Sequence, residues 1–126
     1  MINSNGDTTW GFYSEWGSTW EKANDPCPTG WRLPTRNELQ SLGYVSSQWT
    51  TLNGVNGRLF GNDNVLFLPT AGYRRRFDSG SLAYVGTSGH YWSGTSISGH
   101  VYFTYDSFFI TYPNVINCYS VRCVVE

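Results

Sequence analysis

One stretch of the sequence says more about the fold than any other: DPCPTGWRLPTRNEL, residues 25–39. The prolines at its start exclude helix interior, because proline lacks a backbone donor and restricts the residue before it. Thr35 followed by Glu38 is the pattern of a capping box, which marks the beginning of a helix. Two leucines follow at helical spacing, so we expect a short helix from Arg36 to about Leu42, ended by the next glycine.

Beyond this helix, short apolar segments alternate with glycine-containing turns, as in β-rich regions. Alternation places Val101, Phe103 and Tyr105 on one side of a strand, and we expect these three, with Ile110, to be core. Residues 53–64 are polar and contain glycine, and they are expected to be a loop. The pattern predicts an α+β domain with one or two short helices and a late, twisted, mostly antiparallel sheet with long loops. Strands are expected at residues 65–69, 81–85, 101–106, 108–111 and 119–125, with another opening at His90.

Length and composition define the class of protein. The 126 residues suffice for one domain with its own core; we expect residues 10–126 to form it, and residues 1–9 to be a disordered or linker lead-in. The net charge is −1, so no broad field favours nucleic acid or an anionic membrane. No apolar run approaches the ~20 residues that span a bilayer. The first residues lack the plan of a signal peptide, so either this export route is not used or a leader or preceding domain lies outside this sequence.

The segment from Ser93 to Tyr119 has an unusual composition. It contains seven aromatic residues, its only formal charge is Asp106, and it has no Lys, Arg, Glu, Gln, Met, Leu, Ala or Trp. Tyrosine with small polar residues dominates antibody recognition surfaces, because tyrosine gives a large contact area with few rotatable bonds. The segment therefore favours a contact surface. The alternative is an aromatic-rich sheet whose rings fill a core, and the two faces of one sheet can do both.

The cysteines and histidines give no sign of a metal site. Cys27, Cys118 and Cys123 are an odd number, so at least one is unpaired. A bridge between Cys27 and Cys123 would close a long loop, whereas a bridge between Cys118 and Cys123, five positions apart, is a less natural pairing. The chain has no CxxC, and residues 62–64 offer calcium a single carboxylate. We therefore expect no metal and no cofactor.

Six motifs, in a fixed order, resemble one protein family. They are Asp25–Thr35, Asn53–Gly57, Leu66–Pro69 with Ala71–Arg74, Val85–Gly86, Tyr91–Thr95 and Ser120–Val124. Together they resemble the Fibrobacter succinogenes major paralogous domain, a family abundant in gut Bacteroidetes. That family is similar to C-type lectin-like domains and to the formylglycine-generating-enzyme branch of the same fold. The resemblance implies a C-type-lectin-like fold whose first and last segments meet, and it supports a Cys27–Cys123 disulfide.

The resemblance also implies a source of variation. In some members of the family a diversity-generating retroelement rewrites the C-terminal part by mutating adenines, typically in Asn codons that end in a pyrimidine. Such codons cannot become codons for Lys, Glu, Gln, Met or Trp, and the segment from Ser93 to Tyr119 lacks all five. The whole chain has only one Lys and two Gln, so these residue types are rare throughout it.

The expected ligand-binding surface combines the outward side of the late strands with neighbouring loops. Strand alternation selects residues between positions 100 and 114, and the resemblance places three loops near the same surface. The expected contact residues are Arg75, Arg76, Phe77, Tyr84, His90, His100, Tyr102, Thr104, Asp106, Phe108, Phe109, Tyr112 and Asn114.

These features favour a non-enzymatic binding module for a protein or glycan ligand, acting at a cell surface or on a phage particle, in an oligomeric state that stays open. Neither nucleic acid nor membrane insertion is expected. No catalytic residues are expected, because no histidine stands in a plausible triad with a nucleophile and a carboxylate. One alternative is a structural surface or pilus module, in which a neighbouring domain would cover the outward aromatic side chains. The other is an oxidase like the formylglycine-generating enzyme, which works through a pair of cysteines.

Overall fold

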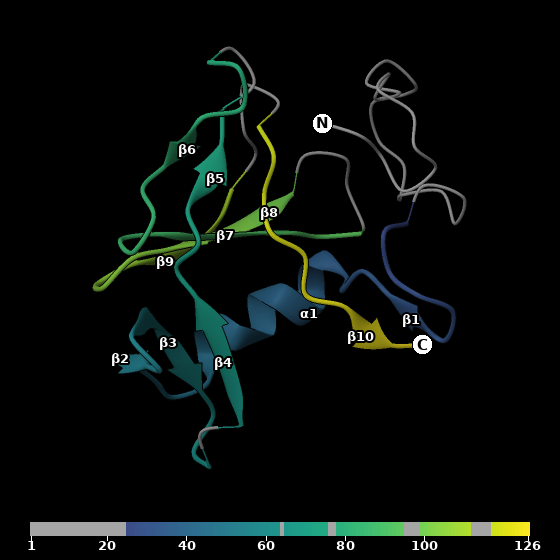
Figure 1. Ribbon diagram of the computed structural model, residues 1–126. Helices are drawn as coiled ribbons and strands as arrows, with labels where there is room; N and C mark the ends of the chain where they lie inside the picture. The colour runs from purple at the N-terminus through teal and green to yellow at the C-terminus, as the bar shows by residue number, and fades with distance from the viewer. Residues whose placement is uncertain (1–24, 64, 76–77, 95–98, 112–116) are drawn as a thin grey trace.

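The computed structural model describes residues 25–63, 65–75, 78–94, 99–111 and 117–126, and these form an α+β arrangement (Figure 1). The elements in chain order are β1 (Trp31–Arg32), α1 (Arg36–Ser41), the 3-10 helix η2 (Leu42–Tyr44), β2 (Ser47–Leu52), β3 (Val55–Phe60), β4 (Leu66–Pro69), β5 (Tyr73–Arg74), β6 (Leu82–Ala83), β7 (Gly89–Trp92), β8 (His100–Phe103), β9 (Phe108–Thr111) and β10 (Val124–Val125). The expected lead-in at residues 1–9 lies outside the described residues.

The helix begins where its capping box predicts. The Thr35 hydroxyl accepts from the Glu38 backbone N–H at 3.1 Å, and the Glu38 carboxylate accepts from the Thr35 N–H at 2.7 Å. Arg32 donates both guanidinium ends to the same carboxylate at 2.7 and 2.9 Å, and this pairing lowers the pKa of Glu38 to about 2. The next turn tightens into η2 instead of continuing the α-helix.

The middle of the chain forms a three-stranded antiparallel sheet in the order β2-β3-β4. The expectation of a loop at residues 53–64 was therefore wrong, because β3 occupies half of that segment. Asn53 and Gly54 form the turn between β2 and β3, with φ values of 50° and 78°. Asn-Gly with positive φ at both residues is the strongest short-range signal for a two-residue hairpin. The polar and glycine residues of the whole segment 53–64 favour a loop, and this average outweighs the signal of the two turn residues.

The sheet β7-β8-β9 is the central layer. Figure 1 shows it nearly edge-on, with α1 on one side and the β5-β6 hairpin on the other. Its helix-facing side supplies the core: Val101 and Phe103 are fully buried, and the Phe103 ring lies 6.1 Å from that of Phe60 in β3. Gly89 opposes Phe103 across the β7-β8 pair, where a Cβ would lie 2.2 Å from the ring.

Three of the four residues expected in the core belong to it, and one does not. Val101 and Phe103 are fully buried, and Ile110 is half-buried against the same cluster. Tyr105 is 69% exposed, so its assignment to the core was wrong. The strand β8 ends at Phe103 and residues 104–107 form the turn to β9, so strand alternation no longer applies at Tyr105.

The two ends of the described chain are joined. Cys27 and Cys123 form a disulfide between residues 96 positions apart, which is the pairing that the family resemblance implies. β1 pairs antiparallel with β10, and the Glu126 N–H donates to the Gly30 carbonyl at 3.1 Å. The strand expected at residues 119–125 is shorter than predicted, because only β10 has regular pairing.

Between the central sheet and β10, the C-terminal segment crosses the central sheet at its β7 edge, passing from the β5 side towards β10 (Figure 1). Single bridges join Cys118 to Arg74 and Ser120 to Tyr91. This crossing places Tyr119 over the central sheet, where its ring lies 4.2 Å from the ring of His100. The face of β7-β8-β9 that points away from the core is thus partly covered by a second aromatic layer.

Candidate functional site

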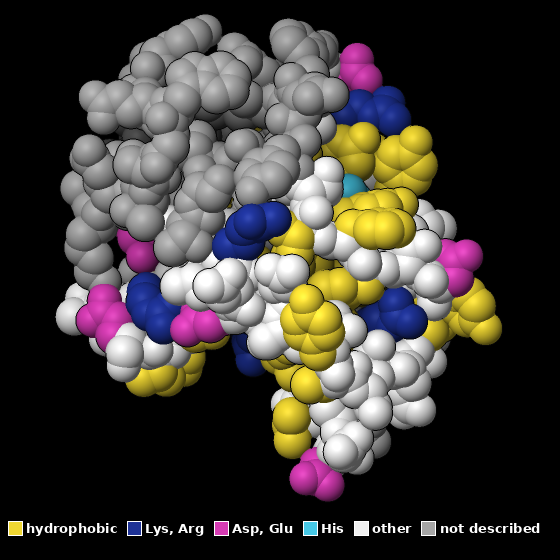
Figure 2. Space-filling view, turned by 180° about the vertical axis from the view of Figure 1, so that it is seen from behind, with side chains coloured by type: hydrophobic (Ala, Val, Ile, Leu, Met, Phe, Trp, Pro, Cys, Tyr) yellow, Lys and Arg dark blue, Asp and Glu magenta, His cyan; other side chains and the backbone are white. Residues whose placement is uncertain are grey.

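An open pocket of about 310 Å³ lies on the face of the central sheet that points away from α1. In Figure 2 hydrophobic side chains surround a small area of histidine surface, and arginine and acidic side chains lie nearby. The volume is at the small end of the range for ligand pockets. The residues that line the pocket come from β5, the β6-β7 connection, β7 and the end of β8: Tyr73, Tyr84, Thr87, Ser88, His90, Tyr102 and Thr104.

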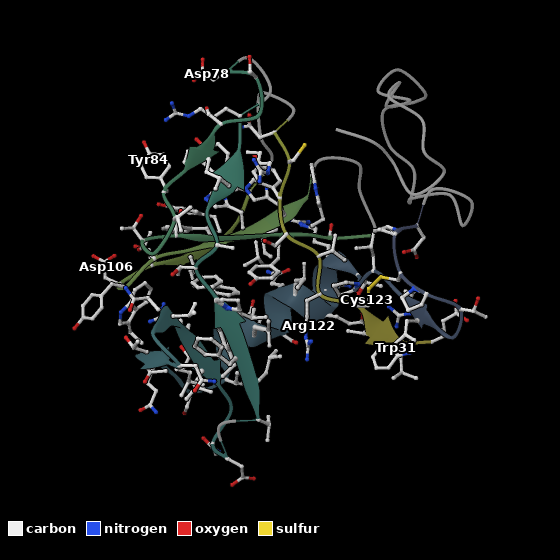
Figure 3. All side chains as sticks on the ribbon, viewed as in Figure 1. Trp31, Asp78, Tyr84, Asp106, Arg122 and Cys123 are labelled. Carbon is white, nitrogen blue, oxygen red and sulfur yellow. A yellow bond between two sulfur atoms is a disulfide. The ribbon has the colours of Figure 1, made fainter. Side chains whose placement is uncertain are left out.

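Tyr84 forms one wall of the pocket and is held in an uncommon backbone conformation. Its φ is 57° and its side chain is 58% exposed. A left-handed conformation costs a non-glycine residue roughly 1–2 kcal/mol, and residues held in it concentrate at functional sites. Figure 3 shows Tyr84 projecting from the β6 side of the molecule, on the same edge as Asp106.

The turn around Tyr84 is fixed by several hydrogen bonds. The Tyr84 carbonyl accepts from the Thr87 N–H at 3.2 Å, the Ser88 N–H at 3.1 Å and the Thr87 hydroxyl at 3.0 Å. The Gly86 N–H donates to Thr70, and the Gly86 carbonyl accepts from the Asn56 side chain at 3.2 Å. Because both sides of the turn are bonded to the rest of the fold, the surroundings impose the position of Tyr84.

Gly72 allows the backbone to approach this turn closely. Its φ is 66°, and a Cβ there would lie 2.0 Å from the carbonyl oxygen of Ala83. The next residue, Tyr73, stacks on Tyr84 with a centroid distance of 5.9 Å and meets His90 edge-on at 4.9 Å. The glycine therefore lets β5 bring a second tyrosine into the pocket.

The base of the pocket contains an uncharged histidine. His90 is 8% exposed, and its Nε2 lies 3.0 Å from the Ser88 hydroxyl. Burial lowers the pKa of His90 to about 4, so the ring is neutral at pH 7. His90 Nδ1 has no hydrogen-bond partner among the described residues. The tautomer with its proton on Nε2, donating to Ser88, is favoured because it leaves an acceptor rather than a donor unsatisfied.

A serine beside a histidine can also begin a catalytic arrangement, which needs a carboxylate to orient the imidazole. Ser88 is 3% exposed, and the described lining residues include no carboxylate. Ser88 and His90 lie together at the base of the pocket.

The rim on the β8-β9 side is a compact turn. Thr104 donates its hydroxyl proton to the Asp106 carboxylate at 2.9 Å, and Ser107 donates to the same oxygen at 3.0 Å. These hydrogen bonds lower the pKa of Asp106, so it is ionised at neutral pH. Arg58, from β3, donates to the carbonyl oxygens of Thr104 at 3.1 Å, Tyr105 at 3.3 Å and Ser107 at 3.4 Å.

Most of the described residues that the sequence predicted for the binding surface come together here. Tyr84, His90, Tyr102 and Thr104 line the pocket. Three further residues adjoin it: the Phe109 ring stacks on Tyr102 at 6.3 Å, Asp106 accepts from Thr104, and Arg75 is hydrogen-bonded to Tyr73, which raises the Arg75 pKa. The predicted contacts Arg76, Phe77, Tyr112 and Asn114 lie outside the described residues.

Two predicted contact residues are not at this surface. His100 is 3% exposed, because Tyr119 and Trp92 pack around its ring and His90 stacks on it at 5.5 Å. Phe108 pairs with Phe103 on the other side of the sheet, and its ring lies 5.8 Å from that of Phe60. His100 is therefore buried beneath the site, and Phe108 belongs to the hydrophobic core.

Sequence reasoning missed Tyr73, Thr87, Ser88 and the positioning role of Arg58. Tyr73 lies within the Ala71–Arg74 motif, and Thr87 and Ser88 follow the Val85–Gly86 motif, so neither pattern marks these residues as ligand contacts. A usable signal for Thr87 and Ser88 is their place between Gly86 and Gly89, since polar residues between glycines indicate a turn and loops often carry binding residues. No local pattern could have linked Arg58 to a turn that begins 46 residues later.

The cysteines and acidic groups show no arranged chemistry among the described residues. Cys118 is a half-buried thiol whose pKa burial raises, and Cys123 is bonded to Cys27, so the two cysteines do not form a pair of free thiols. The described residues contain no group of three or more His, Cys, Asp or Glu side chains placed to hold a metal ion. None of the helices in the described part of the chain has the length and apolar character needed to cross a membrane.

Comparison with protein-family models, curated proteins and solved structures found no match to this chain.

Proposed function

We propose that this protein is a non-enzymatic binding module on a C-type-lectin-like scaffold, and that its ligand surface is the aromatic pocket together with the residues around it. The observation that carries the proposal is the convergence on one open pocket of Tyr84, from the β6-β7 connection, with Tyr102 and Thr104, from the end of β8. The ligand is a glycan or a protein on a cell surface, and the protein acts at a bacterial surface or on a phage particle.

The character of this surface supports recognition. Tyr84 and Phe109 are 58% and 55% exposed, and each is stacked on a further aromatic ring, Tyr73 and Tyr102 respectively. Stacking limits ring motion before any ligand arrives, so the surface loses little conformational freedom on binding. Rigid aromatic side chains beside small hydroxyl groups are the usual composition of binding hot spots.

The scaffold part of the proposal rests on the sequence motifs and on the way the ends of the chain meet. A disulfide and a two-stranded pair join the first and last described segments, as a C-type-lectin-like arrangement requires. Retroelement variation is supported by the residue types at the surface positions. Tyr102, Thr104, Asp106 and Phe109 are all residue types that adenine mutation of an Asn codon ending in a pyrimidine can produce.

A binding experiment with paired variants tests the proposed surface. Purified protein would be applied to arrays of glycans and of cell-surface proteins, and the same arrays would be probed with the double variant Tyr102→Ala/Phe109→Ala. We expect at least a tenfold loss of binding, since removal of central aromatic contacts typically costs 2 kcal/mol or more. Thermal unfolding of each variant would show that the fold persists.

The matched control is Tyr44→Ala/Leu52→Ala. These side chains are 80% and 42% exposed but line no part of the pocket. Equal binding by the wild type and the Tyr102/Phe109 variant, or an equal loss in the control, would reject this surface.

Retroelement variation has a separate test in the neighbouring DNA. We expect a reverse transcriptase gene and a near-identical template copy that differs only where the template has adenine. A copy identical across residues 93–119, or no copy, would remove this part of the proposal and leave the binding surface untouched.

A further inference from the structure

The two threonine hydroxyl groups of the pocket can accept hydrogen bonds from a ligand. Thr87 donates its only hydroxyl proton to the Tyr84 carbonyl at 3.0 Å, and Thr104 donates its own to Asp106 at 2.9 Å. A threonine hydroxyl has one proton and two lone pairs, so each oxygen has acceptor capacity left after this donation. Because both residues line the pocket, the pocket offers acceptors at two separate positions. A ligand that is complementary at these two positions carries hydrogen-bond donors.

The described residues that line the pocket offer no favourable site for a negative charge. Its lining residues are tyrosine, threonine, serine and a histidine that burial keeps neutral at pH 7. The nearby cation Arg75 is paired with Asp78 at 3.3 Å, and the adjoining Asp106 carries a negative charge. An anionic ligand would lose hydration without a counter-charge in the pocket, so an uncharged ligand is favoured.

The walls and the size of the pocket restrict the shape of the ligand. Tyr73, Tyr84 and Tyr102 contribute three aromatic rings, and the Tyr73–Tyr84 pair is nearly parallel, with an interplanar angle of 27°. An aromatic ring packs well against a flat set of C–H groups. A volume of about 310 Å³ admits one ring-sized group rather than an extended chain.

We propose that the pocket binds one neutral hexopyranose unit, the end or a branch of a glycan. A pyranose has an apolar C–H face for the tyrosine rings and several hydroxyl protons for the Thr87 and Thr104 oxygens. Two other ligand classes fit the pocket less well. An alkylammonium ion needs a carboxylate partner, which the described lining does not contain, and a phenol has only one hydrogen-bond donor for the two threonine oxygens. This inference rests on the proposed binding function and specifies the ligand class of the same site.

Nuclear magnetic resonance titration of the whole protein provides the direct test. The probes are the methyl glycosides of glucose, galactose, mannose and N-acetylglucosamine, with butylammonium chloride, p-cresol and sodium acetate as competing ligand classes. We expect at least one glycoside to shift the amide signals of Thr87, Ser88 and Thr104 saturably, with a Kd of about 1 mM, as befits a small ligand. Shifts of these signals with a competing class, and with none of the glycosides, would overturn the inference.

Variants at Tyr84 separate a binding role from a structural one. Tyr84→Asn places a residue that tolerates positive φ at a position with φ of 57°, so we expect an unchanged or higher Tm together with at least a tenfold weaker glycoside response. Tyr44→Asn removes another exposed tyrosine, outside the pocket lining, and should retain the response. A lower Tm with full glycoside binding in Tyr84→Asn would overturn the role of this ring.

Variants at Thr104 test the acceptor role. Thr104→Val keeps the side-chain shape without the oxygen and should lose most of the glycoside response, whereas Thr104→Ser should restore it. Equal responses in these two variants would contradict the acceptor role. If the arrays reveal a ligand that depends on Tyr102 and Phe109 while the glycosides do not bind, the sugar inference falls and the proposed function stands. If neither assay shows binding, both fall.

Discussion

The guanidinium of Arg58 donates to the backbone carbonyl of Thr104 at 3.1 Å, across 46 positions of the sequence. The same side chain reaches the carbonyls of Tyr105 and Ser107 at 3.3 and 3.4 Å. One residue of the β2-β3-β4 sheet thus holds the turn at the end of β8, where Thr104 borders the pocket. The rim of the candidate site is therefore supported by a part of the chain that does not itself line the pocket.

Arg58→Lys is expected to loosen this turn. Lysine cannot reach three carbonyls with a planar fork, so we expect a loss of about 1–3 kcal/mol in the free energy of unfolding. The Thr104 amide, which donates to Ser107 at 2.9 Å within the turn, should exchange its hydrogen faster. Arg122→Lys, at an exposed arginine, is the control and should change stability by less than about 0.5 kcal/mol. Unchanged exchange at Thr104 in Arg58→Lys would contradict the role of Arg58.

Gly72→Ala and Gly86→Ala form a matched pair, because both glycines have positive φ and only one is crowded. A Cβ at Gly72 would lie 2.0 Å from the Ala83 carbonyl oxygen, whereas a Cβ at Gly86 meets nothing within 4 Å. We expect Gly86→Ala to cost about 1–2 kcal/mol from backbone strain alone, and Gly72→Ala to cost more than about 3 kcal/mol. Chemical denaturation of both variants measures the difference. Equal losses would mean that the contact between Gly72 and the Tyr84 turn is not as close as described.

The burial of a neutral His90 predicts that the protein loses stability in mild acid. The unfolded chain takes up a proton at this residue near pH 6.5, whereas burial holds the folded pKa near 4. Lowering the pH between these values therefore favours the unfolded state. The free energy of unfolding is unaffected by His90 above pH 6.5, and it decreases by about 3 kcal/mol by pH 4. His90→Gln should flatten the dependence of the unfolding free energy on pH within this window.

Glu38→Gln is the matched control for the His90 experiment. The folded pKa of Glu38 is about 2 and its ordinary value is 4.5, so its stabilisation disappears at lower pH than that of His90. The variant should keep the wild-type slope between pH 6.5 and 4.5. An identical slope in the wild type and His90→Gln would show that His90 is not held neutral by burial.

The Cys27–Cys123 disulfide is expected to be a major source of stability. It links residues 96 positions apart, and loop-closure entropy in the unfolded state then corresponds to about 4–5 kcal/mol. A reducing agent, or the double substitution Cys27→Ser/Cys123→Ser, should lower the denaturant midpoint, and the free energy of unfolding derived from it should fall by a comparable amount. Cys118→Ser should leave both the midpoint and the effect of the reducing agent largely unchanged. A midpoint insensitive to reduction would contradict the bridge.

The elements that the sequence predicts correctly are those fixed by contacts between residues close together in the chain. The capping box at Thr35 and Glu38 places the start of α1 correctly, because its hydrogen bonds join residues three positions apart. The strand at residues 108–111 has the expected bounds. The hairpin of β2 and β3 was not predicted, because the composition of the whole segment 53–64 indicates a loop, whereas the turn signal lies in Asn53 and Gly54 alone.

The candidate site was predictable only in part, and the errors share a cause. Strand alternation correctly separates Val101 and Phe103 from Tyr102, and the pairing of Tyr102 with Phe109 keeps both on one face. Strand alternation gives no information about which other segment of the chain covers that face. His100 shares it with Tyr102, yet His100 is buried, because the C-terminal segment brings Tyr119 onto one end of the sheet and leaves the other end open.

The amino-acid sequence by itself determined the α+β class, the beginning of the helix, the strand at residues 108–111 and the aromatic, nearly uncharged composition of residues 93–119. These depend on residues close together in the chain, whose spacing decides hydrogen bonding and the side of a strand on which each side chain lies. Only the tertiary structure decided which of these side chains form a pocket. Tyr73 meets Tyr84 because Gly72 permits a close approach, Thr104 is held by Arg58, and Tyr119 covers His100. Each of these contacts joins separate segments, and its position depends on how the whole chain packs.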